Sequence, residues 1–440
     1  MKYIYKLFLA LYLIVGIVPS FEAIDKVVTQ WFYLNLLNTI ALLFIFVNQV
    51  PLKKILLNKS SILFISLFVW SSLTLFVSIN QSESLVALSQ LFALVLGFIV
   101  LTYCISNIQN AFGFISSVLS VYLLFELGAI YIPFLIREDL DLNLIFTRSA
   151  VFLGFAANVN ITAFSVLYKV PFLVYSLLQL KKFKYISIVF LATPIFLLVI
   201  FASGTLNSTR AAILTYTILA PILVFVGTII YVKSKQNRLL ILSVSYTVSL
   251  LLSFPLNSFL SDSLGKSESN ISNRISTLTA LVDQEEKKDG SLTQRINFYS
   301  QATNFIFKNP ILGTGIGNWK IKSIDTNKKN IVGYQVPYHV HNDFLEIAAE
   351  KGLIGLGLYL AILFFGFKNA IVKFLKNIFT KSELDKNYLQ WISISLYAFI
   401  FLIDSNLNFP FYRPIVIIIL IVLLAYQTVL MQTNLNAKQG

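Results

Sequence analysis

The chain has 440 residues, of which 57% are hydrophobic and only 12% charged, and its mean hydropathy of +0.78 implies that lipid is its main solvent. The formal charge of +14 would suit a nucleic-acid partner, unless membrane topology explains where the basic residues lie. The single cysteine, Cys104, lies in an apolar stretch, which excludes a disulfide framework and a cysteine metal site.

Apolar runs long enough to cross about 30 Å of hydrocarbon predict an all-α polytopic membrane protein with about twelve transmembrane helices. The first run begins like a signal peptide, but it continues to about Val18 without a cleavage site, so we expect it to be the first span. The runs lie near 4 to 20, 31 to 50, 61 to 79, 85 to 105, 111 to 134, 161 to 180, 185 to 202, 210 to 232, 239 to 256, 353 to 367, 388 to 404 and 414 to 431.

The loop charges predict the orientation, because cytoplasmic loops carry an excess of Lys and Arg. With the N-terminus inside, the cytoplasmic segments hold 17 basic residues and only two acidic ones, Glu383 and Asp385. Both termini are therefore expected in the cytoplasm. Membrane topology accounts for the positive net charge, so a nucleic-acid partner is not needed to explain it. The 17 residues are Lys2, Lys6, Lys53, Lys54, Lys59, Lys181, Lys182, Lys184, Lys233, Lys235, Arg238, Lys368, Lys373, Lys376, Lys381, Lys386 and Lys438.

Two connections are long, roughly 135 to 160 and 257 to 345, and both are expected outside the cytoplasm. We expect a nine-helix transmembrane region over 1–256, a large extracytoplasmic loop over 257–345, and a three-helix C-terminal transmembrane region over 346–440. In the large loop, Ser291 and Gln294 form a capping-box signature, and apolar residues follow at helical spacing up to Pro310. This pattern predicts an amphipathic helix.

Several acidic and basic residues stand in unusual places. Asp139 and Asp141 have a spacing that can hold a divalent ion, although two acids in a polar loop also arise by chance. Glu126 and Lys169 lie inside apolar spans and are expected to face the bundle interior or a cavity, with their pairing left open. No role is assigned to these four residues or to Asp404.

The chain's only two histidines, His339 and His341, precede the tenth span. They suit proton transfer, but a histidine at a membrane boundary is also common as a plain interfacial side chain. A zinc site that joins them with Asp343 or Glu346 is a further alternative.

Two arginines are candidates for binding an anion. Arg210 follows Ser208 and Thr209, either of which can cap the eighth span, and a helix N-terminus beside an arginine attracts anions. Arg295 lies near the start of the amphipathic helix. The alternative for Arg210 is a side chain that reaches the membrane interface, and for Arg295 a solvated polar face.

The sequence His341-Asn342, nine residues, Gly352, two residues, Gly355 resembles the signature of the O-antigen ligase and polymerase superfamily. The resemblance extends to the turn at 310–315, Pro-Ile-Leu-Gly-Thr-Gly, and to the Ser-Thr-Arg-Ala-Ala element at 208–212. In the latter, Thr209 and Ala211 replace the commoner Ser and Gly.

The resemblance implies a GT-C-like fold in the bacterial inner membrane, a periplasmic active site and an undecaprenyl-diphosphate-linked glycan as donor. By position, Arg210 and Arg295 would hold the diphosphate, and His341 would be the base of an inverting transfer that uses no metal or cofactor. Asn342, or alternatively Asp343, would orient the imidazole, and His339 would have a supporting role.

The acceptor distinguishes the remaining interpretations. A ligase passes the glycan to lipid A-core, whereas a polymerase passes a growing chain to another lipid-linked repeat unit, and protein O-glycosylation is open as well. A transporter or flippase for lipid-linked glycans is the alternative from another class, because it also needs many spans and internal charges.

Overall fold

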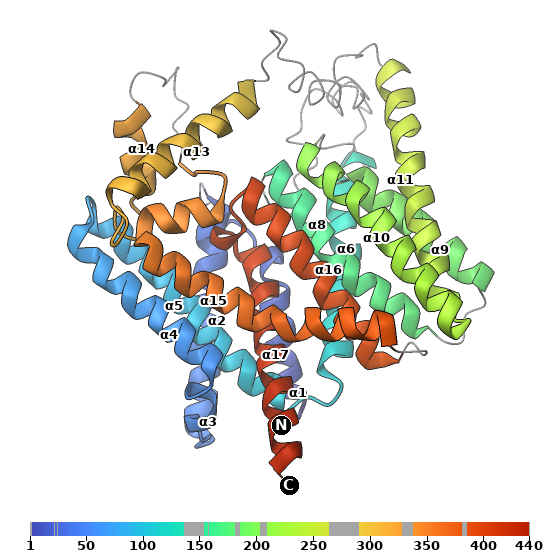
Figure 1. The fold of residues 1–440 in the computed structure, drawn as a ribbon, viewed down its shortest axis with the longest axis horizontal. Helices are drawn as coiled ribbons and strands as arrows, with labels where there is room; N and C mark the ends of the chain where they lie inside the picture. Colours follow the sequence, from blue (N-terminus) through green and yellow to red (C-terminus); the bar gives the residue numbers. More distant parts are fainter. Residues whose placement is uncertain are drawn as a thin grey trace. The chain divides into compact units, whose positions relative to one another are not determined.

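The computed structural model describes residues 2–21, 23, 25–135, 154–156, 158–180, 185–202, 209–263, 290–327, 338–380 and 385–439. In this part of the chain every regular element is a helix (Figure 1). Ten of the described helices are long and apolar enough to cross a membrane, and the predicted spans at 4 to 20 and 185 to 202 fall on two shorter apolar helices. The prediction of an all-α polytopic membrane protein is confirmed.

Contacts between residues divide the chain into two compact units, each described by itself. Unit 1 consists of Met1–Ala111, Asp289–Asn369 and Asp404–Gly440, and unit 2 of Phe112–Lys288 and Ala370–Ile403. This division does not test the expected three-part division at 256 and 345, which follows membrane topology and stays a prediction.

Unit 1 is organised around two long helices, α5 and α17, which pack against each other. Almost every side chain of α17 from Ile415 to Tyr426 is buried, as expected for a run that is apolar on all faces. The helices wholly in this unit are α1 (Lys2–Leu13), α2 (Lys26–Val47), α3 (Lys53–Leu56), α4 (Lys59–Leu73), α5 (Gln81–Ser106), α13 (Gly290–Lys308), α14 (Trp319–Asn327) and α17 (Pro414–Gln439), with 3₁₀ turns η1 (Val15–Ile17), η2 (Thr74–Val77) and η6 (Pro410–Tyr412).

Within unit 1, the start of α1, the end of α17 and the short helix α3 lie at one end, and α13 and α14 lie at the opposite end (Figure 1). The predicted amphipathic helix is present as α13, which ends two residues before Pro310. The two termini therefore share one end of this unit, and the helix that carries Arg295 lies at the other end.

Unit 2 contains a buried ion pair. Nζ of Lys169 lies 2.7 Å from Oε2 of Glu126, both side chains are fully buried, and the Ser165 hydroxyl donates to the other carboxylate oxygen. The pairing that the sequence leaves open is thus present.

The helices wholly in unit 2 are α8 (Val159–Gln179), α9 (Tyr185–Ile200), α10 (Arg210–Ser234) and α11 (Arg238–Ser263). Helix α6 (Ala111–Leu135) belongs to unit 2 after its first residue, and α15 (Asp343–Thr380) and α16 (Lys386–Leu407) each have residues in both units.

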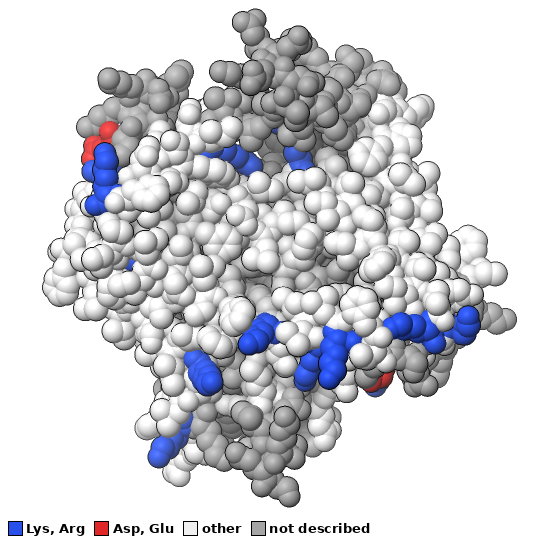
Figure 2. All heavy atoms as spheres, viewed as in Figure 1, with Lys and Arg blue, Asp and Glu red and all other residues white. Residues whose placement is uncertain are grey.

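Large apolar side chains cover much of the outside of the helices. On α2, Phe32 is 70% exposed and Phe46 is 81% exposed, and Phe190 on α9 is 76% exposed. On the face drawn in Figure 2, uncharged residues occupy wide areas between separate groups of basic side chains. Such surfaces are stable in lipid, where apolar side chains need no covering.

Candidate functional site

The loop that carries the two histidines is tied to the start of α15. Asn342 caps this helix, because its Oδ1 accepts a hydrogen bond from the Leu345 N–H at 3.0 Å. One carboxylate oxygen of Glu346 lies 2.7 Å from Nδ1 of His339, and the other accepts from the Val340 N–H at 2.9 Å. The loop conformation is therefore defined by polar contacts at its base.

His341 has an unusual backbone and a ring placed between aromatic side chains. Its φ of 60° lies in the left-handed region, which residues other than glycine rarely adopt and which is found at functional sites. The imidazole lies nearly parallel to the Phe298 ring, with centroids 6.4 Å apart, and meets the Phe409 ring edge-on at 5.2 Å. These two rings hold the imidazole in place.

The two residues expected to orient the imidazole make other contacts. Nδ1 of His341 is buried and has no hydrogen-bond partner among the described residues. Asn342 caps α15, and the buried Asp343 accepts a hydrogen bond from the Phe411 N–H at 3.1 Å. Both residues thus support the backbone on either side of the site, and neither hydrogen-bonds to the ring in the described structure.

The electrostatic surroundings of His341 are positive. Burial lowers the pKa of His341, and the charges of Arg295, His339 and Arg413 add to this effect, so that the pKa is about 4. The imidazole is consequently neutral at pH 7 and free to accept a proton.

Arg295 comes to the site on α13, one helical turn before Tyr299. The Tyr299 hydroxyl lies 3.0 Å from the carbonyl oxygen of His341 and 2.9 Å from that of Asn406, so it connects α13 with both the histidine loop and the end of α16. Burial lowers the pKa of Arg295, which means that its guanidinium is poorly solvated. No carboxylate of the described residues lies within ion-pair distance of it.

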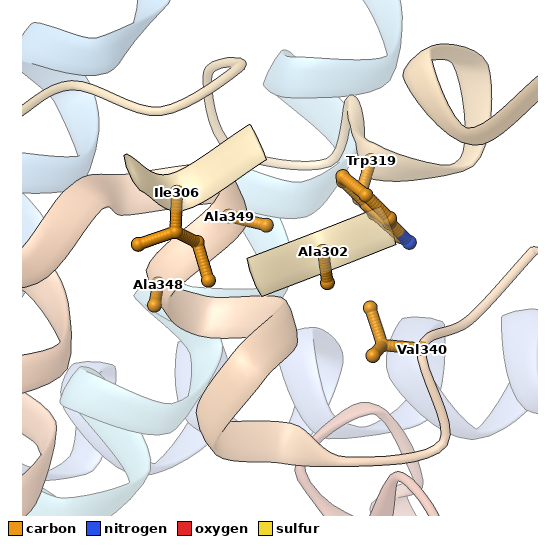
Figure 3. Close-up of a cluster of buried hydrophobic side chains, with 6 residues drawn as sticks. All are labelled: Ala302, Ile306, Trp319, Val340, Ala348 and Ala349. Atoms are coloured by element: carbon orange, nitrogen blue, oxygen red, sulfur yellow. The ribbon is translucent and has the colours of Figure 1, made fainter. Parts of the chain in front are cut away.

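A small hydrophobic cluster fixes α13 against the first turns of α15. Side chains from α13, from the start of α14, from the histidine loop and from α15 meet in it (Figure 3). The position of Arg295 relative to His341 therefore depends on apolar packing as well as on the Tyr299 hydroxyl. The cluster comprises Ala302, Ile306, Trp319, Val340, Ala348 and Ala349.

The first motif glycine marks a break in α15. Gly352 has φ 67° and ψ −178°, a conformation that interrupts the helix, and a Cβ there would collide with the carbonyl of Ile311. The Leu353 N–H donates to the Pro310 carbonyl at 2.7 Å, and the Thr314 N–H donates to the Ala349 carbonyl at 2.9 Å. The two sequence elements that resemble the superfamily thus bind each other at this break.

The second motif glycine leaves room for a buried polar group. Gly355 lies against Lys351 and Trp70, and the Trp70 indole N–H donates to the Lys351 carbonyl at 2.8 Å. The Lys351 ammonium lies 3.1 Å from a carboxylate oxygen of Glu350, which also accepts from the Tyr412 hydroxyl at 3.0 Å. This network connects the break in α15 with η6.

Sequence reasoning missed the aromatic segment 409–413, which includes η6. Phe409 stacks on His339 with centroids 4.0 Å apart and also contacts His341, while the guanidinium of Arg413 lies 4.7 Å from the Phe409 ring centroid. In the sequence, a lone arginine between two apolar spans resembles an interfacial anchor. Its relation to the two histidines becomes visible only in the fold. The signal in the sequence was the density of aromatic residues in the segment.

Arg210 begins α10 in unit 2. Thr209 occupies the predicted cap position, but its side chain makes no capping hydrogen bond. Ser208 lies outside the described residues, and so do Asp139 and Asp141, whose metal role stays untested. In the described part of the chain, no three His, Cys, Asp or Glu side chains group as metal ligands would.

Residues 195–360 match the family model described as O-antigen ligase. This region, which covers less than half of the chain, is therefore similar to the O-antigen ligase family and supports the resemblance to the ligase and polymerase superfamily. None of the curated proteins compared with the chain matches it. The O-antigen ligase region contains Arg210, Arg295, His341 and both motif glycines, and it ends before η6 and Arg413. The apolar helices indicate a multi-pass membrane protein, and the match supports a function of the O-antigen ligase or polymerase type.

Proposed function

We propose that the chain transfers a glycan from an undecaprenyl-diphosphate-linked donor to an acceptor hydroxyl on the periplasmic face of the bacterial inner membrane. The observation that carries this proposal is that the Tyr299 hydroxyl ties α13, the helix that carries Arg295, to the His341 carbonyl at 3.0 Å, within the region that matches the family model. Burial and the charge of Arg295 both lower the pKa of His341, which favours a neutral imidazole. A proton acceptor near a positive charge suits a displacement in which the leaving group is a diphosphate.

The proposed step is a single inverting displacement. The acceptor oxygen forms a bond to the anomeric carbon while the bond from that carbon to the diphosphate oxygen breaks. His341 takes the hydroxyl proton, and undecaprenyl diphosphate leaves with the bonding electron pair. Arg210 and Arg295 hold the diphosphate and stabilise the charge that develops on it. His339, supported by Glu346, holds the loop that presents His341.

Because arginine charges take the role that an ion would play, the proposed transfer is independent of metal. Purified protein treated with EDTA should therefore retain full activity. Loss of activity in EDTA, with recovery in magnesium or manganese, would instead favour a metal role for Asp139 and Asp141.

We infer that the acceptor is lipid A-core, as in a ligase. The experiment is in vitro transfer by the detergent-solubilised protein from a purified polyprenyl-diphosphate glycan, offered both lipid A-core and a second lipid-linked repeat unit. Glycan attached to lipid A-core supports the ligase, whereas longer lipid-linked chains would make the protein a polymerase. Absence of any transfer, with a normal size-exclusion profile, would contradict the proposed function.

A further inference from the structure

The segment 409–413 presents a guanidinium at the site from a rigid support. The Arg413 N–H donates to the Pro410 carbonyl at 3.1 Å, and the Arg413 carbonyl accepts from Val416 and Ile417 at 3.0 and 2.9 Å. The first part of the helix that follows, α17 from Pro414 to Thr428, is buried. Arg413 is therefore held at the corner between η6 and α17, where its backbone has little freedom to move.

The charge of Arg413 is not neutralised within the described part of the chain. None of the described carboxylates lies within ion-pair distance of it, and its Nε is buried without a hydrogen-bond partner. Asp25 and Glu346 attract it from farther away. Both are already engaged, Asp25 as the cap of α2 and Glu346 with His339 and the Val340 N–H.

The position of Arg413 relates it to both histidines through one ring. Phe409 stacks on His339, contacts the edge of His341 and lies under the Arg413 guanidinium at 4.7 Å. Arg295 and Arg413 also both act on the titration of His341. Two partly buried and poorly neutralised guanidiniums near one proton acceptor form a site that an anion would stabilise, because withdrawing a charge from water without a close counter-ion is costly.

We propose that Arg413 is a further anion-binding residue of this site, which together with Arg295 holds a phosphate-bearing group of the substrate next to His341. This inference rests on the proposed function. A diphosphate that joins a lipid to a sugar carries two negative charges spread over several oxygens, so it can accept a contact from Arg413 in addition to those proposed above. The same chemistry is present in phosphate groups of a lipid acceptor, so the experiment has to separate donor from acceptor.

The test compares Arg413→Met, Arg413→Lys and the control Lys320→Met in the full-length detergent-solubilised protein. Lys320 is a suitable control because it is a half-exposed cation that already pairs with Glu83. We expect Arg413→Met to lower kcat/KM by about 10²-fold and to weaken inhibition by inorganic diphosphate, as removal of one charged contact does at comparable sites. Arg413→Lys should recover part of both losses, and Lys320→Met should behave as wild type.

A pH profile separates anion binding from a merely structural role. Removing the Arg413 charge makes protonation of His341 easier, so the acid limb of kcat/KM should move to higher pH in Arg413→Met and less in Arg413→Lys. If only the KM for the donor rises in Arg413→Met, the bound anion is the donor diphosphate. If only the KM for the acceptor rises, the bound anion is a phosphate of the acceptor. Unchanged KM values, diphosphate inhibition and acid limb would overturn the inference.

A binding measurement keeps the inference testable apart from the proposed function. Inorganic diphosphate should raise the unfolding temperature of wild type and of Lys320→Met, and it should raise that of Arg413→Met much less. If wild type transfers no glycan but shows this pattern, the anion site stands and the proposed function fails. If Arg413→Met does not fold, Arg413→Lys decides, and diphosphate stabilisation equal to wild type in that variant, with an unmoved acid limb, would contradict the inference.

Discussion

The imidazole of His341 has a pKa of about 4 because it is buried and lies near the positive charges of Arg295 and Arg413. If His341 is the base and the arginines bind a diphosphate, as proposed, the same positive charges weaken the base in the free protein. A bound diphosphate would offset these charges and raise the pKa, so that the base strengthens only when the donor is present. The site would then couple donor binding to activation of the acceptor.

This coupling predicts two different pH profiles. Since a base works in its neutral form, activity falls as the pH drops through the pKa of His341. The acid limb of kcat/KM, which reports the free enzyme, should lie near pH 4, and that of kcat, which reports the complex, should lie at higher pH. Steady-state rates measured at saturating and at low donor concentration test this. An acid limb of kcat/KM near the ordinary histidine pKa of about 6.5 would contradict it.

Substitution of Arg210 or Arg295, the two arginines identified from the sequence, should lower the rate of transfer. Arg295→Ala and Arg210→Ala should each lower kcat by about 10²- to 10³-fold without loss of membrane insertion, because each removes a charge-assisted contact to the diphosphate. Replacement by Lys should recover only part, since Lys cannot bind two oxygens in the same plane. Transfer assays with expression checked in the membrane fraction measure this, and near wild-type activity in either Ala variant would remove that residue from the site.

At the scale of the element, the break in α15 at Gly352 determines where the histidine loop lies. The turn at 310–315 binds the backbone on both sides of the break, and α13 leads into that turn, so the helix with Arg295 and the loop with His341 share one support. The number of residues between His341 and Gly352 therefore sets how long the first helical segment of α15 is, from the histidine loop to the turn at 310–315.

Two glycines of α15 offer a matched comparison. Gly352→Ala should destabilise the protein by about 1–3 kcal/mol or more, because of its positive φ and because the new Cβ collides with the Ile311 carbonyl. At Gly357, where an added Cβ meets nothing within 4 Å, Ala should be neutral or slightly stabilising. Thermal unfolding in detergent measures both, and equal unfolding temperatures for the two variants would show that the break is not needed.

The elements were largely predictable from the sequence, and their contacts were not. Apolar runs reveal a span because lipid requires them, and the predicted tenth span begins at residue 353, directly after the break. Arg413 was missed because its relation to His341 arises from folding across 72 residues, and a single arginine between spans has no periodic signal. For the same reason the cap at Asn342 and the support by Glu346 became visible only in the structure.

At the scale of the whole molecule, the orientation in the membrane rests on the distribution of charge. In unit 1 both termini lie at the end opposite α13 and α14. If the positive-inside rule holds, that end is cytoplasmic, and the loop over 257–345, with ten basic and eight acidic residues, lies outside. Donor glycans on the outer leaflet would then meet the end that carries Arg295 and His341.

Cysteine labelling tests this orientation. In a Cys104→Ser background, a cysteine at Gly290 should react with a membrane-impermeant maleimide added to cells whose outer membrane has been permeabilised. A cysteine at Lys53, on the end predicted to be cytoplasmic, should react only after the inner membrane is opened. The reverse pattern would place the site in the cytoplasm and exclude a periplasmic transfer.

The most direct test of the central claim compares the two histidines in the same transfer assay. His341→Ala should lower transfer from a purified polyprenyl-diphosphate glycan by about 10²- to 10⁴-fold, as expected for loss of a positioned general base. His339→Ala should leave a measurable fraction, because Asn342 still caps α15 and the Phe298 and Phe409 rings still flank His341. Full activity in His341→Ala, with a normal size-exclusion profile, would contradict the account.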